Sequence, residues 1–316
     1  MRKYRVAVLG YYGFGNLGDE LLLSACIDML ARSGIDRKKL LVLSNSPDDT
    51  AESFGVDAIN RWHYRELFRA FRECDTLLLG GGGLFQDITS VKSCAWYWAV
   101  VRLAKLCGVK LWAMGQSVGP LRSRMGRMLA GDALRLCGVV HVRDDNSMSV
   151  AKTLGCANVI RGCDLVMTLS PGNFTRKPEY MLVNLRPSPE LERYVKILTP
   201  YITPDTIGAA LSPDDVNALK LAGVREIVRV KNFREASSLW AGASCAVGMR
   251  LHFGVLSRIF GTPSALLPYD VKVSEFAEQS GVPCIVDEWQ APVKPRAVPD
   301  SVHEVDRVCK EILSLQ

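Results

Sequence analysis

A regular alternation of apolar, strand-length runs with segments of helical periodicity is the feature of this chain that most limits how it can fold. Continuous apolar strands that alternate with helices are typical of a parallel sheet with helices on both faces. In the first half of the chain, the expected strands are residues 4–9, 39–44, 75–83, 109–115 and 138–143; in the second half they are residues 180–186, 225–230, 245–250, 263–269 and 283–287. The sequence therefore predicts an α/β fold whose strands are joined by right-handed crossovers.

The alternation stops near residue 170 and resumes near residue 180, and the segment between carries Pro171, Gly172 and Pro178. Proline and glycine at this density predict a linker between two domains. The expected parts are an N-terminal domain (1–170), a linker (171–179), a C-terminal domain (180–300) and a closing amphipathic helix (301–316). We expect the two doubly wound domains to face each other across a cleft, with ligands at the carboxyl ends of the strands.

The composition excludes several classes of protein. A formal net charge of +6 over 316 residues is too mild to indicate nucleic-acid binding. Ten cysteines and four histidines are dispersed, with no C-x-x-C pair, so we predict no metal site and expect free thiols in a reducing compartment. No apolar run is long enough to span a bilayer and no signal-peptide pattern is visible, so we expect a cytoplasmic protein.

A glycine-rich stretch, GYYGFGNLGDE (residues 10–20), follows the first expected strand and contains G-x-G-x-x-G at residues 13–18. This spacing is that of a dinucleotide-binding loop, which also requires an acid at the end of the second strand. The second strand instead ends in residues 44–46, Ser-Asn-Ser. Asp19 and Glu20 also put negative charge where a pyrophosphate would lie. The sequence therefore disfavours a nicotinamide or flavin cofactor.

Two other interpretations of this stretch stay open. In the first, it is a structural glycine turn in which Asp19 helps to cap the following helix. In the second, Gly15 and Gly18 allow close approach of the backbone, and the loop presents Asn16 and Asp19 to a neutral, hydroxyl-rich ligand.

Two further glycine-rich loops are expected after strands, GGGGLFQD at residues 80–87 and GQSVGPL at residues 115–121. Consecutive glycines allow positive φ and expose amides that can bind an anion. The candidate residues in these loops are Gly81, Gly82, Gly83, Asp87 and Gln116. Three successive strands that end in such loops indicate a binding edge of the sheet.

The strongest local signal is GMRLHFGVL, in which Arg250 and His252 lie between a strand and a helix. Arginine binds carboxylate or phosphate in a bidentate fork, and histidine gives or takes a proton near neutral pH. Other basic residues at or just past the carboxyl ends of expected strands are Arg143, Arg186 and Lys272. The alternative for each is a solvated charge or an ion pair, such as Arg143 with Asp144 or Asp145.

Taken together, these motifs resemble the polysaccharide pyruvyl transferase family, in particular its CsaB-type members. The segments that carry the resemblance are YYGFGNLGDELLL, LLLGGGGLFQD, MGQSVGPL, VRDDNS, CDLVMTL, VNLRPS and GMRLHFGVLSRIFGTPSALLPYDVKVSEF. They occur in the expected order over most of residues 6–286. The resemblance implies two Rossmann-like domains in a GT-B-like fold.

The resemblance also implies the reaction. Pyruvate would pass from phosphoenolpyruvate to two hydroxyls of one sugar residue, giving a 4,6-type ketal and inorganic phosphate. The implied acceptor is an N-acetylmannosamine unit of a lipid-linked secondary cell-wall glycan, whose ketal anchors surface-layer homology domains. No metal, nucleotide or other cofactor is required, because phosphoenolpyruvate is itself the donor substrate.

Roles for the candidate residues follow from the same resemblance. Arg250 and Arg143 are expected to hold the donor's carboxylate and phosphate, with Lys272 and Arg186 as further cations. His252 is the expected general acid. The expected acceptor side comprises Asp19 or Asp87 as the base, with Asn16 and Gln116 orienting the sugar.

Two alternatives and one additional surface complete the expectations. The alternatives are a nucleotide-sugar-dependent GT-B glycosyltransferase and a non-catalytic sugar- or lipid-binding module. Arg124, Arg127 and Arg135 fall on one side of an expected helix, and the aromatic cluster AWYW lies at residues 95–98. A basic face near aromatic residues favours peripheral contact with the inner face of the cell membrane; a solvated face beside a core helix is the alternative.

Overall fold

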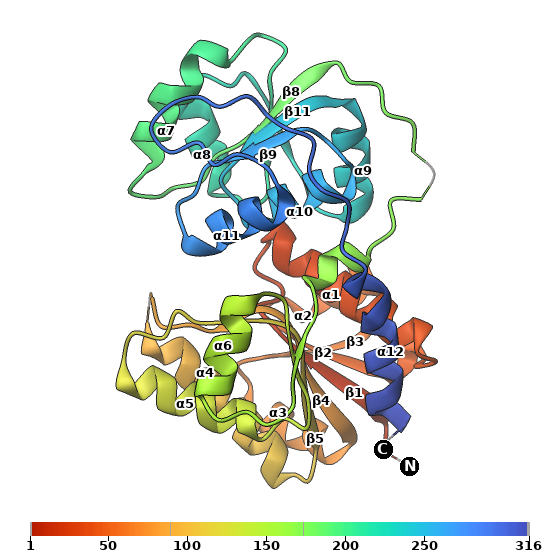
Figure 1. Ribbon diagram of the computed structural model, residues 1–316. Helices are drawn as coiled ribbons and strands as arrows, with labels where there is room; N and C mark the ends of the chain where they lie inside the picture. Colours follow the sequence, from red (N-terminus) through yellow and green to blue (C-terminus); the bar gives the residue numbers. More distant parts are fainter. Residues whose placement is uncertain (1, 89, 173, 315–316) are drawn as a thin grey trace. The chain divides into compact units, whose positions relative to one another are not determined.

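The computed structural model describes residues 2–88, 90–172 and 174–314 (Figure 1). By its internal contacts the chain divides into two units. The first unit comprises Met1–Phe14, Leu22–Thr168 and Pro299–Gln316, and the second comprises Gly15–Leu21 and Leu169–Val298.

The first unit contains a seven-stranded sheet in the order β3-β2-β1-β4-β5-β6-β7, and every pairing between these strands is parallel. Its strands are β1 (Tyr4–Leu9), β2 (Leu40–Ser44), β3 (Asp57–Asn60), β4 (Cys74–Phe85), β5 (Lys110–Val118), β6 (Val140–Val142) and β7 (Val159–Arg161). The central strands β1, β2 and β4 are buried almost throughout. Such burial on both faces is why these strands read as continuous apolar runs.

Helices pack around this sheet, and several begin at a side-chain cap. They are α1 (Leu17–Arg32), α2 (Pro47–Phe54), α3 (Tyr64–Arg72), α4 (Val91–Leu106), α5 (Arg124–Arg135), α6 (Asp145–Thr153) and α12 (Ser301–Ser314), with 3-10 turns at Arg37–Lys39 and Leu165–Thr168. Ser90, Ser123 and Asp144 cap α4, α5 and α6 by accepting backbone N–H bonds. These caps satisfy donors that a helix N-terminus otherwise leaves open.

The second unit contains a five-stranded parallel sheet in the order β10-β9-β8-β11-β12. Its strands are β8 (Tyr180–Asn184), β9 (Ile207–Ala210), β10 (Glu226–Arg229), β11 (Ala243–Gly248) and β12 (Ser264–Leu266). Its helices are α7 (Leu191–Leu198), α8 (Asp215–Leu221), α9 (Phe233–Gly242), α10 (Leu251–Ile259) and α11 (Val271–Ser280), with a 3-10 turn at Thr199–Tyr201. The predicted α/β fold with two parallel sheets is therefore confirmed.

The structure differs from the sequence prediction at several elements. The strands expected at residues 75–83 and 109–115 are present but run further, to Phe85 in β4 and Val118 in β5, so much of the two later glycine-rich segments is strand and not loop. Within these strands φ is positive at Gly81, Gly82 and Gly115. The predicted strand at residues 283–287 is reduced to an isolated bridge of Cys284 with Leu266. Elements that the sequence did not predict are α2, β3, β7, α7, β9 and α8.

The two units also divide the chain differently from the expected domains. Residues 15–21, placed in the first domain by sequence order, group by contact with the second unit. Helix α1 therefore begins in one unit and continues in the other. The closing helix α12 groups with the first unit, and residue 173 of the expected linker lies outside the described residues.

Candidate functional site

The order of strands in the second sheet reverses between β8 and β11, which lie side by side. Ligands in open α/β sheets bind outside the carboxyl ends of the strands at such a switch point. Arg186 follows β8, and Arg250 and His252 follow β11. The topology thus brings three of the predicted site residues to one edge of this sheet.

Arg250 is the N-cap residue of α10, and its position is fixed from two directions. Its backbone N–H donates to Asn184 Oδ1 at 3.0 Å. Its guanidinium forms a fork with Asp215, from Nε to Oδ2 at 2.7 Å and from Nη2 to Oδ1 at 2.6 Å. The Arg250 side chain keeps 14% of its surface exposed, whereas the Asp215 side chain keeps none. This fork uses the Nε and Nη2 side of the guanidinium and does not involve Nη1.

Asp215 would be costly to bury without other donors, and the chain supplies three. It accepts from the backbone N–H groups of Leu211 and Ser212 at 3.0 and 3.2 Å, and from Asn184 Nδ2 at 3.2 Å. Leu211 in turn accepts, through its carbonyl oxygen, the backbone N–H of Leu17 at 2.8 Å. The glycine-rich stretch near the N-terminus is therefore tied to the segment that holds Arg250.

Gly18 packs directly against His252, in the first turn of α10. A Cβ at position 18 would lie 2.2 Å from His252 Nδ1, so the imidazole or the backbone would have to shift for any larger residue. Sequence order had placed Gly18 in the first domain, opposite His252. The structure instead brings the two into contact within the second unit.

The polar residues next to this contact are Asn16, which directly precedes α1, and Asp19 in the first turn of that helix. Residues 16–19, the end of the glycine-rich loop with the first turn of α1, are called the Asn16–Asp19 loop. The side-chain amide of Asn16 donates to the Asp19 carboxylate, and its Oδ1 accepts the backbone N–H of Gly18 at 3.3 Å. Both Asn16 and Asp19 are half-buried. Of the predicted acceptor residues, these two share the second unit with Arg250 and His252.

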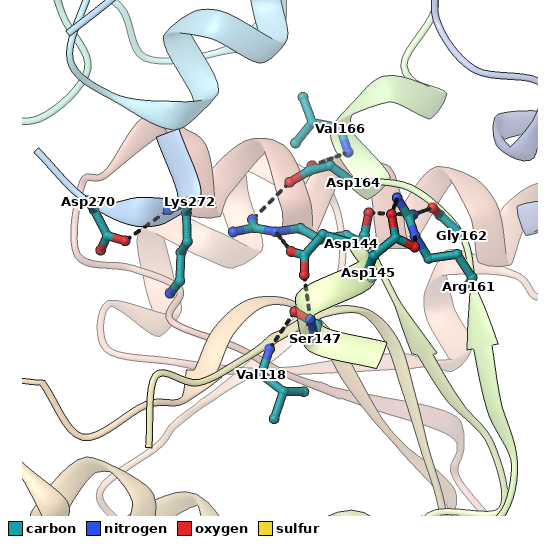
Figure 2. A network of polar contacts seen from close by, with 12 residues as sticks. Val118, Asp144, Asp145, Ser147, Arg161, Gly162, Asp164, Val166, Asp270 and Lys272 are labelled. Atoms are coloured by element: carbon teal, nitrogen blue, oxygen red, sulfur yellow. Dashed lines mark hydrogen bonds and ion pairs between the residues drawn. The ribbon is translucent and has the colours of Figure 1, made fainter. Parts of the chain in front are cut away.

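The other two predicted site cations of the second unit are Arg186 and Lys272. The Arg186 guanidinium lies 4.4 Å from the centre of the Tyr269 ring, a cation–π contact. Lys272 lies in the first turn of α11, where its backbone N–H donates to the capping Asp270 at 3.0 Å (Figure 2). The Lys272 side chain is half-buried.

Arg143, in the first unit, is more deeply buried and has two carboxylate partners. Its side chain is 7% exposed, with Nη1 3.0 Å from Asp164 and Nε 3.4 Å from Asp144. Asp144 also accepts the backbone N–H of Ser147 and so caps α6 (Figure 2). The Ser147 hydroxyl in turn accepts the backbone N–H of Val118. The expected alternative pairing with Asp144 is thus present, although Asp145 pairs with Arg161 instead.

The two remaining acceptor candidates, Asp87 and Gln116, have structural contacts in the first unit. Asp87 accepts the backbone N–H groups of Arg122 and Ser123 at 2.6 and 2.7 Å, and the Ser123 hydroxyl at 2.6 Å. Burial alone would raise the pKa of Asp87, but these donors and the charge of Arg127 lower it overall. Gln116 lies in β5 with no exposed surface, and its amide donates to the carbonyl of Leu79 at 3.0 Å.

Two glycines of β4 have a backbone conformation that favours glycine. With φ of 76° and 83°, Gly81 and Gly82 adopt the left-handed conformation that side chains disfavour. A Cβ at position 81 would lie 2.8 Å from a methyl group of Leu22. Gly83 lies in the same strand and is exposed.

The sequence predicted neither a metal site nor a membrane span. Within the ranges 2–88, 90–172 and 174–314, no three His, Cys, Asp or Glu side chains gather where they could hold a metal ion. None of the helices in that part of the chain is long and apolar enough to cross a membrane.

The residues that fix the predicted site side chains in place were not predicted from the sequence. Asp215 and Asn184 fix Arg250, and Asp164 is the closer partner of Arg143. A signal for Asp215 was present, since it follows Ser212-Pro213-Asp214, a plausible helix start. Its pairing with a residue 35 positions later is set by tertiary structure alone.

The family assignment rests on the sequence together with this fold. The family model described as "Polysaccharide pyruvyl transferase" matches residues 16–271. The chain belongs to the polysaccharide pyruvyl transferase family. The match includes the Asn16–Asp19 loop, Arg250 and His252, and it identifies the protein as a pyruvyltransferase that acts in polysaccharide biosynthesis. No curated protein matches the sequence significantly.

Solved structures share the fold at low identity. The UDP-GlcNAc 2-epimerase of Methanocaldococcus jannaschii is similar with a TM-score of 0.63 and 12% identity, over 97% of this chain and 99% of that one. The UDP-GlcNAc 2-epimerase of Neisseria meningitidis, solved with UDP-GlcNAc, has a TM-score of 0.63 and 11% identity, over 99% and 100%. These likenesses confirm two Rossmann-like domains of the GT-B-like type and say nothing about substrate.

Proposed function

We propose that this pyruvyltransferase takes phosphoenolpyruvate as its donor and forms a ketal, typically 4,6-linked, on one sugar residue of its polysaccharide acceptor. The observation that carries the proposal is the contact of the Asn16–Asp19 loop with His252 beside the Arg250–Asp215 fork. It puts a cation, a proton-transfer group and a carboxylate-bearing loop in one part of the second unit. The proposed acceptor is an N-acetylmannosamine unit of a lipid-linked cell-wall glycan, as in CsaB-type members.

Arg250 is the proposed ligand of the donor's carboxylate or phosphate. The fork with Asp215 fixes the plane of the guanidinium through Nε and Nη2, so the Nη1 edge is the one assigned to the donor. Lys272 and Arg186 are the further cations in the same unit. Arg143 belongs to the first unit, where it carries two carboxylate partners of its own, so its role in donor binding stays a prediction from the sequence.

His252 is the proposed general acid. It would protonate the methylene carbon C3 of phosphoenolpyruvate, which makes an oxocarbenium-like centre at C2. One sugar hydroxyl adds to C2, the C2–O bond to phosphate breaks, and the second hydroxyl closes the ring. The two hydroxyl protons replace the proton given to C3 and the proton carried away by the phosphate, so the sum is a ketal and inorganic phosphate.

Asp19 is the proposed base for the sugar hydroxyls, in preference to Asp87. The oxygens of Asp87 already accept from Arg122 and Ser123, which cap and position α5. Asp19 is half-buried and accepts from Asn16, which is the proposed partner of a second sugar hydroxyl. Gln116 is internal to β5, so its proposed part is to support that strand.

Peripheral membrane contact is proposed for the start of α5, with the protein on the cytoplasmic side. Arg122, Arg124 and Arg127 are exposed there, together with Met125 (52%) and Met128 (58%). Arginines interleaved with long apolar side chains suit an anionic bilayer surface. Of the AWYW cluster, by contrast, Tyr97 is buried and Trp98 donates to Asp132 at 2.7 Å. Co-sedimentation with anionic vesicles at low and high salt tests this contact, and no binding in either would end it.

The function is tested by incubating the protein with phosphoenolpyruvate and a methyl glycoside of N-acetylmannosamine. We expect release of inorganic phosphate and a gain in glycoside mass equal to pyruvic acid less one water. A 6-O-methyl glycoside, which lacks one of the two hydroxyls, should give no ketal. Thermal stabilisation by UDP but not by phosphoenolpyruvate would instead support a nucleotide-sugar glycosyltransferase.

A further inference from the structure

A cluster of aromatic rings around Arg61 lies in the first unit, and none of its residues has a role in the proposed reaction. Arg61 follows β3 and is 2% exposed. Its guanidinium carbon lies over the rings of Trp96 (4.0 Å), Trp62 (5.2 Å), Phe14 (5.4 Å), Tyr97 (5.4 Å) and Tyr11 (5.9 Å). These six residues, which come from three separate parts of the chain, are called the Arg61 cluster.

The charge of Arg61 is unusual for a buried arginine, since such groups are normally paired with a carboxylate. Among the residues that the structure describes, no carboxylate lies within ion-pair range of Arg61. Nη1 donates to the carbonyl of Gly10 at 2.7 Å, while the buried Nε has no acceptor. Cation–π contacts therefore take the place of an ion pair, and they fix the surrounding rings.

Two rings of the cluster face solvent and are nevertheless held in place. Tyr11 is 45% exposed and stacks on Phe14, with ring centres 4.0 Å apart and planes at 10°. Trp62 is 47% exposed, and its Nε1 donates to Asn45 Oδ1 at 2.9 Å. Rigid, exposed aromatic rings give contact area at little cost in conformational entropy. Such rings suit the flat, apolar faces of pyranose sugars.

Polar groups of the kind that bind hydroxyls accompany these rings. Ser46 Oγ and Asn45 Nδ2 donate to the carbonyl of Gly13, at 3.1 and 3.4 Å, and both side chains are half-buried. The chain then runs directly from Phe14 to the Asn16–Asp19 loop. The glycine-rich stretch thus begins among aromatic rings and ends beside His252.

We infer that Tyr11 and Trp62 form a stacking platform for neutral sugar rings of the polysaccharide acceptor, which Arg61 holds rigid from beneath. The inference deepens the proposed function, since it names a subsite for acceptor residues that are not themselves pyruvylated. It rests on the family's polysaccharide substrate and on the Arg61 cluster, not on the roles of Arg250 and His252. Arg61 is a positioning residue, because its guanidinium is covered by the rings.

The experiment measures binding of neutral tetrasaccharides of N-acetylmannosamine, N-acetylglucosamine, glucose and mannose by isothermal titration calorimetry. We expect at least one to bind the whole protein, with the Kd raised roughly tenfold in Trp62→Ala and in Tyr11→Ala. Trp62→Phe, which keeps a flat ring, should recover part of the affinity. Phe68→Ala is the matched control, because Phe68 is 46% exposed and lies on α3 outside the Arg61 cluster.

Three results would overturn the platform: no binding by any tetrasaccharide, equal binding by Trp62→Ala and wild type, or an equal loss in Phe68→Ala. Thermal unfolding of each variant separates lost binding from lost fold. Phosphate release from phosphoenolpyruvate is measured in parallel. If no phosphate is released but the sugar still binds, the proposed reaction is wrong and the platform stands. If phosphate is released but the variants bind the sugar as tightly as the wild type, the platform is wrong and the reaction stands.

Discussion

Arg143 and Arg250 follow strands of the two different sheets, and sequence reasoning gave both the same task. Their surroundings differ. Arg143 is 7% exposed and shares its charge between Asp144 and Asp164. Arg250 is 14% exposed, forms a fork with one carboxylate and stands at the N-terminus of α10 next to His252. The group of Arg143, Asp144 and Asp164 therefore carries a net negative charge, whereas the pair of Arg250 and Asp215 is neutral.

The difference teaches what each arginine can do. An arginine held by two buried carboxylates is first of all a structural counter-ion, since its removal leaves both carboxylates without their cation, although Asp144 keeps the backbone N–H of Ser147 and Asp164 that of Val166. Asp215, by contrast, keeps three neutral donors if Arg250 is lost. Loss of Arg250 should therefore weaken phosphoenolpyruvate binding more than it weakens the fold, and loss of Arg143 should do the opposite.

The largest effect is expected at His252, on the Arg250 side of the comparison. His252→Ala and His252→Gln should lower the rate of phosphate release by about 10²–10⁴, the usual contribution of a general acid. The melting temperature should stay near the wild-type value, because His252 is half-buried at the start of α10. Turnover at the wild-type rate in either variant would remove His252 from the mechanism.

Arg143→Ala tests whether Arg143 is mainly a structural counter-ion. We expect the free energy of unfolding to fall by about 3–5 kcal/mol, because Asp144 and Asp164 are left buried without their cation. Arg250→Ala is the matched variant and should lose less stability. Urea denaturation followed by circular dichroism measures both. If Arg143→Ala keeps wild-type stability but binds phosphoenolpyruvate more weakly, the main role of Arg143 is to bind the donor.

Gly18→Ala tests the contact that brings the loop to His252. A Cβ at this position meets the imidazole at 2.2 Å, so the loop or the ring must shift. Overpacking of this kind costs about 1–3 kcal/mol, and we expect turnover to fall together with the melting temperature. Gly138→Ala is the control, since its Cβ would meet only the Leu111 carbonyl oxygen, at 3.9 Å. Equal turnover in the two variants would mean that the contact is not part of the site.

Much of the fold could be predicted because it depends on local patterns. Buried parallel strands such as β1 and β2 are unbroken apolar runs, and helices such as α12 have a clear periodicity. Short elements at the sheet edges were missed: β3 and β7 are only partly buried and lack such a run. The end of β4 was placed too early, because glycines with positive φ have no sequence pattern that distinguishes a strand from a turn.

The residue types of the candidate site could be predicted from the sequence, but the residues that contact them could not. Arg250 and His252 stand at a strand–helix junction that the sequence displays. The fork with Asp215, the contact with Gly18 and the rings around Arg61 join segments far apart in the chain. Such pairings are set by packing, which a single sequence does not record.

The smallest effect concerns His141, which lies in β6 two residues before Arg143. Burial lowers the pKa of His141 from 6.5 to about 4, and the charge of Arg161 acts in the same direction. Its Nδ1 accepts the backbone N–H of Gly115 at 3.0 Å, a bond that the neutral ring can make. In the unfolded chain His141 takes up its proton near pH 6.5, whereas in the folded chain it stays neutral down to about pH 4. The unfolded state therefore binds more protons within this window.

Stability should consequently fall as the pH drops from 6.5 towards 4. His141→Asn, whose Oδ1 can accept the same N–H, should flatten that part of the profile, and melting temperatures at a series of pH values measure it. His63→Asn is the matched control, because His63 is exposed on the same unit. A profile with the same slope in His141→Asn would mean that the acid sensitivity has another origin.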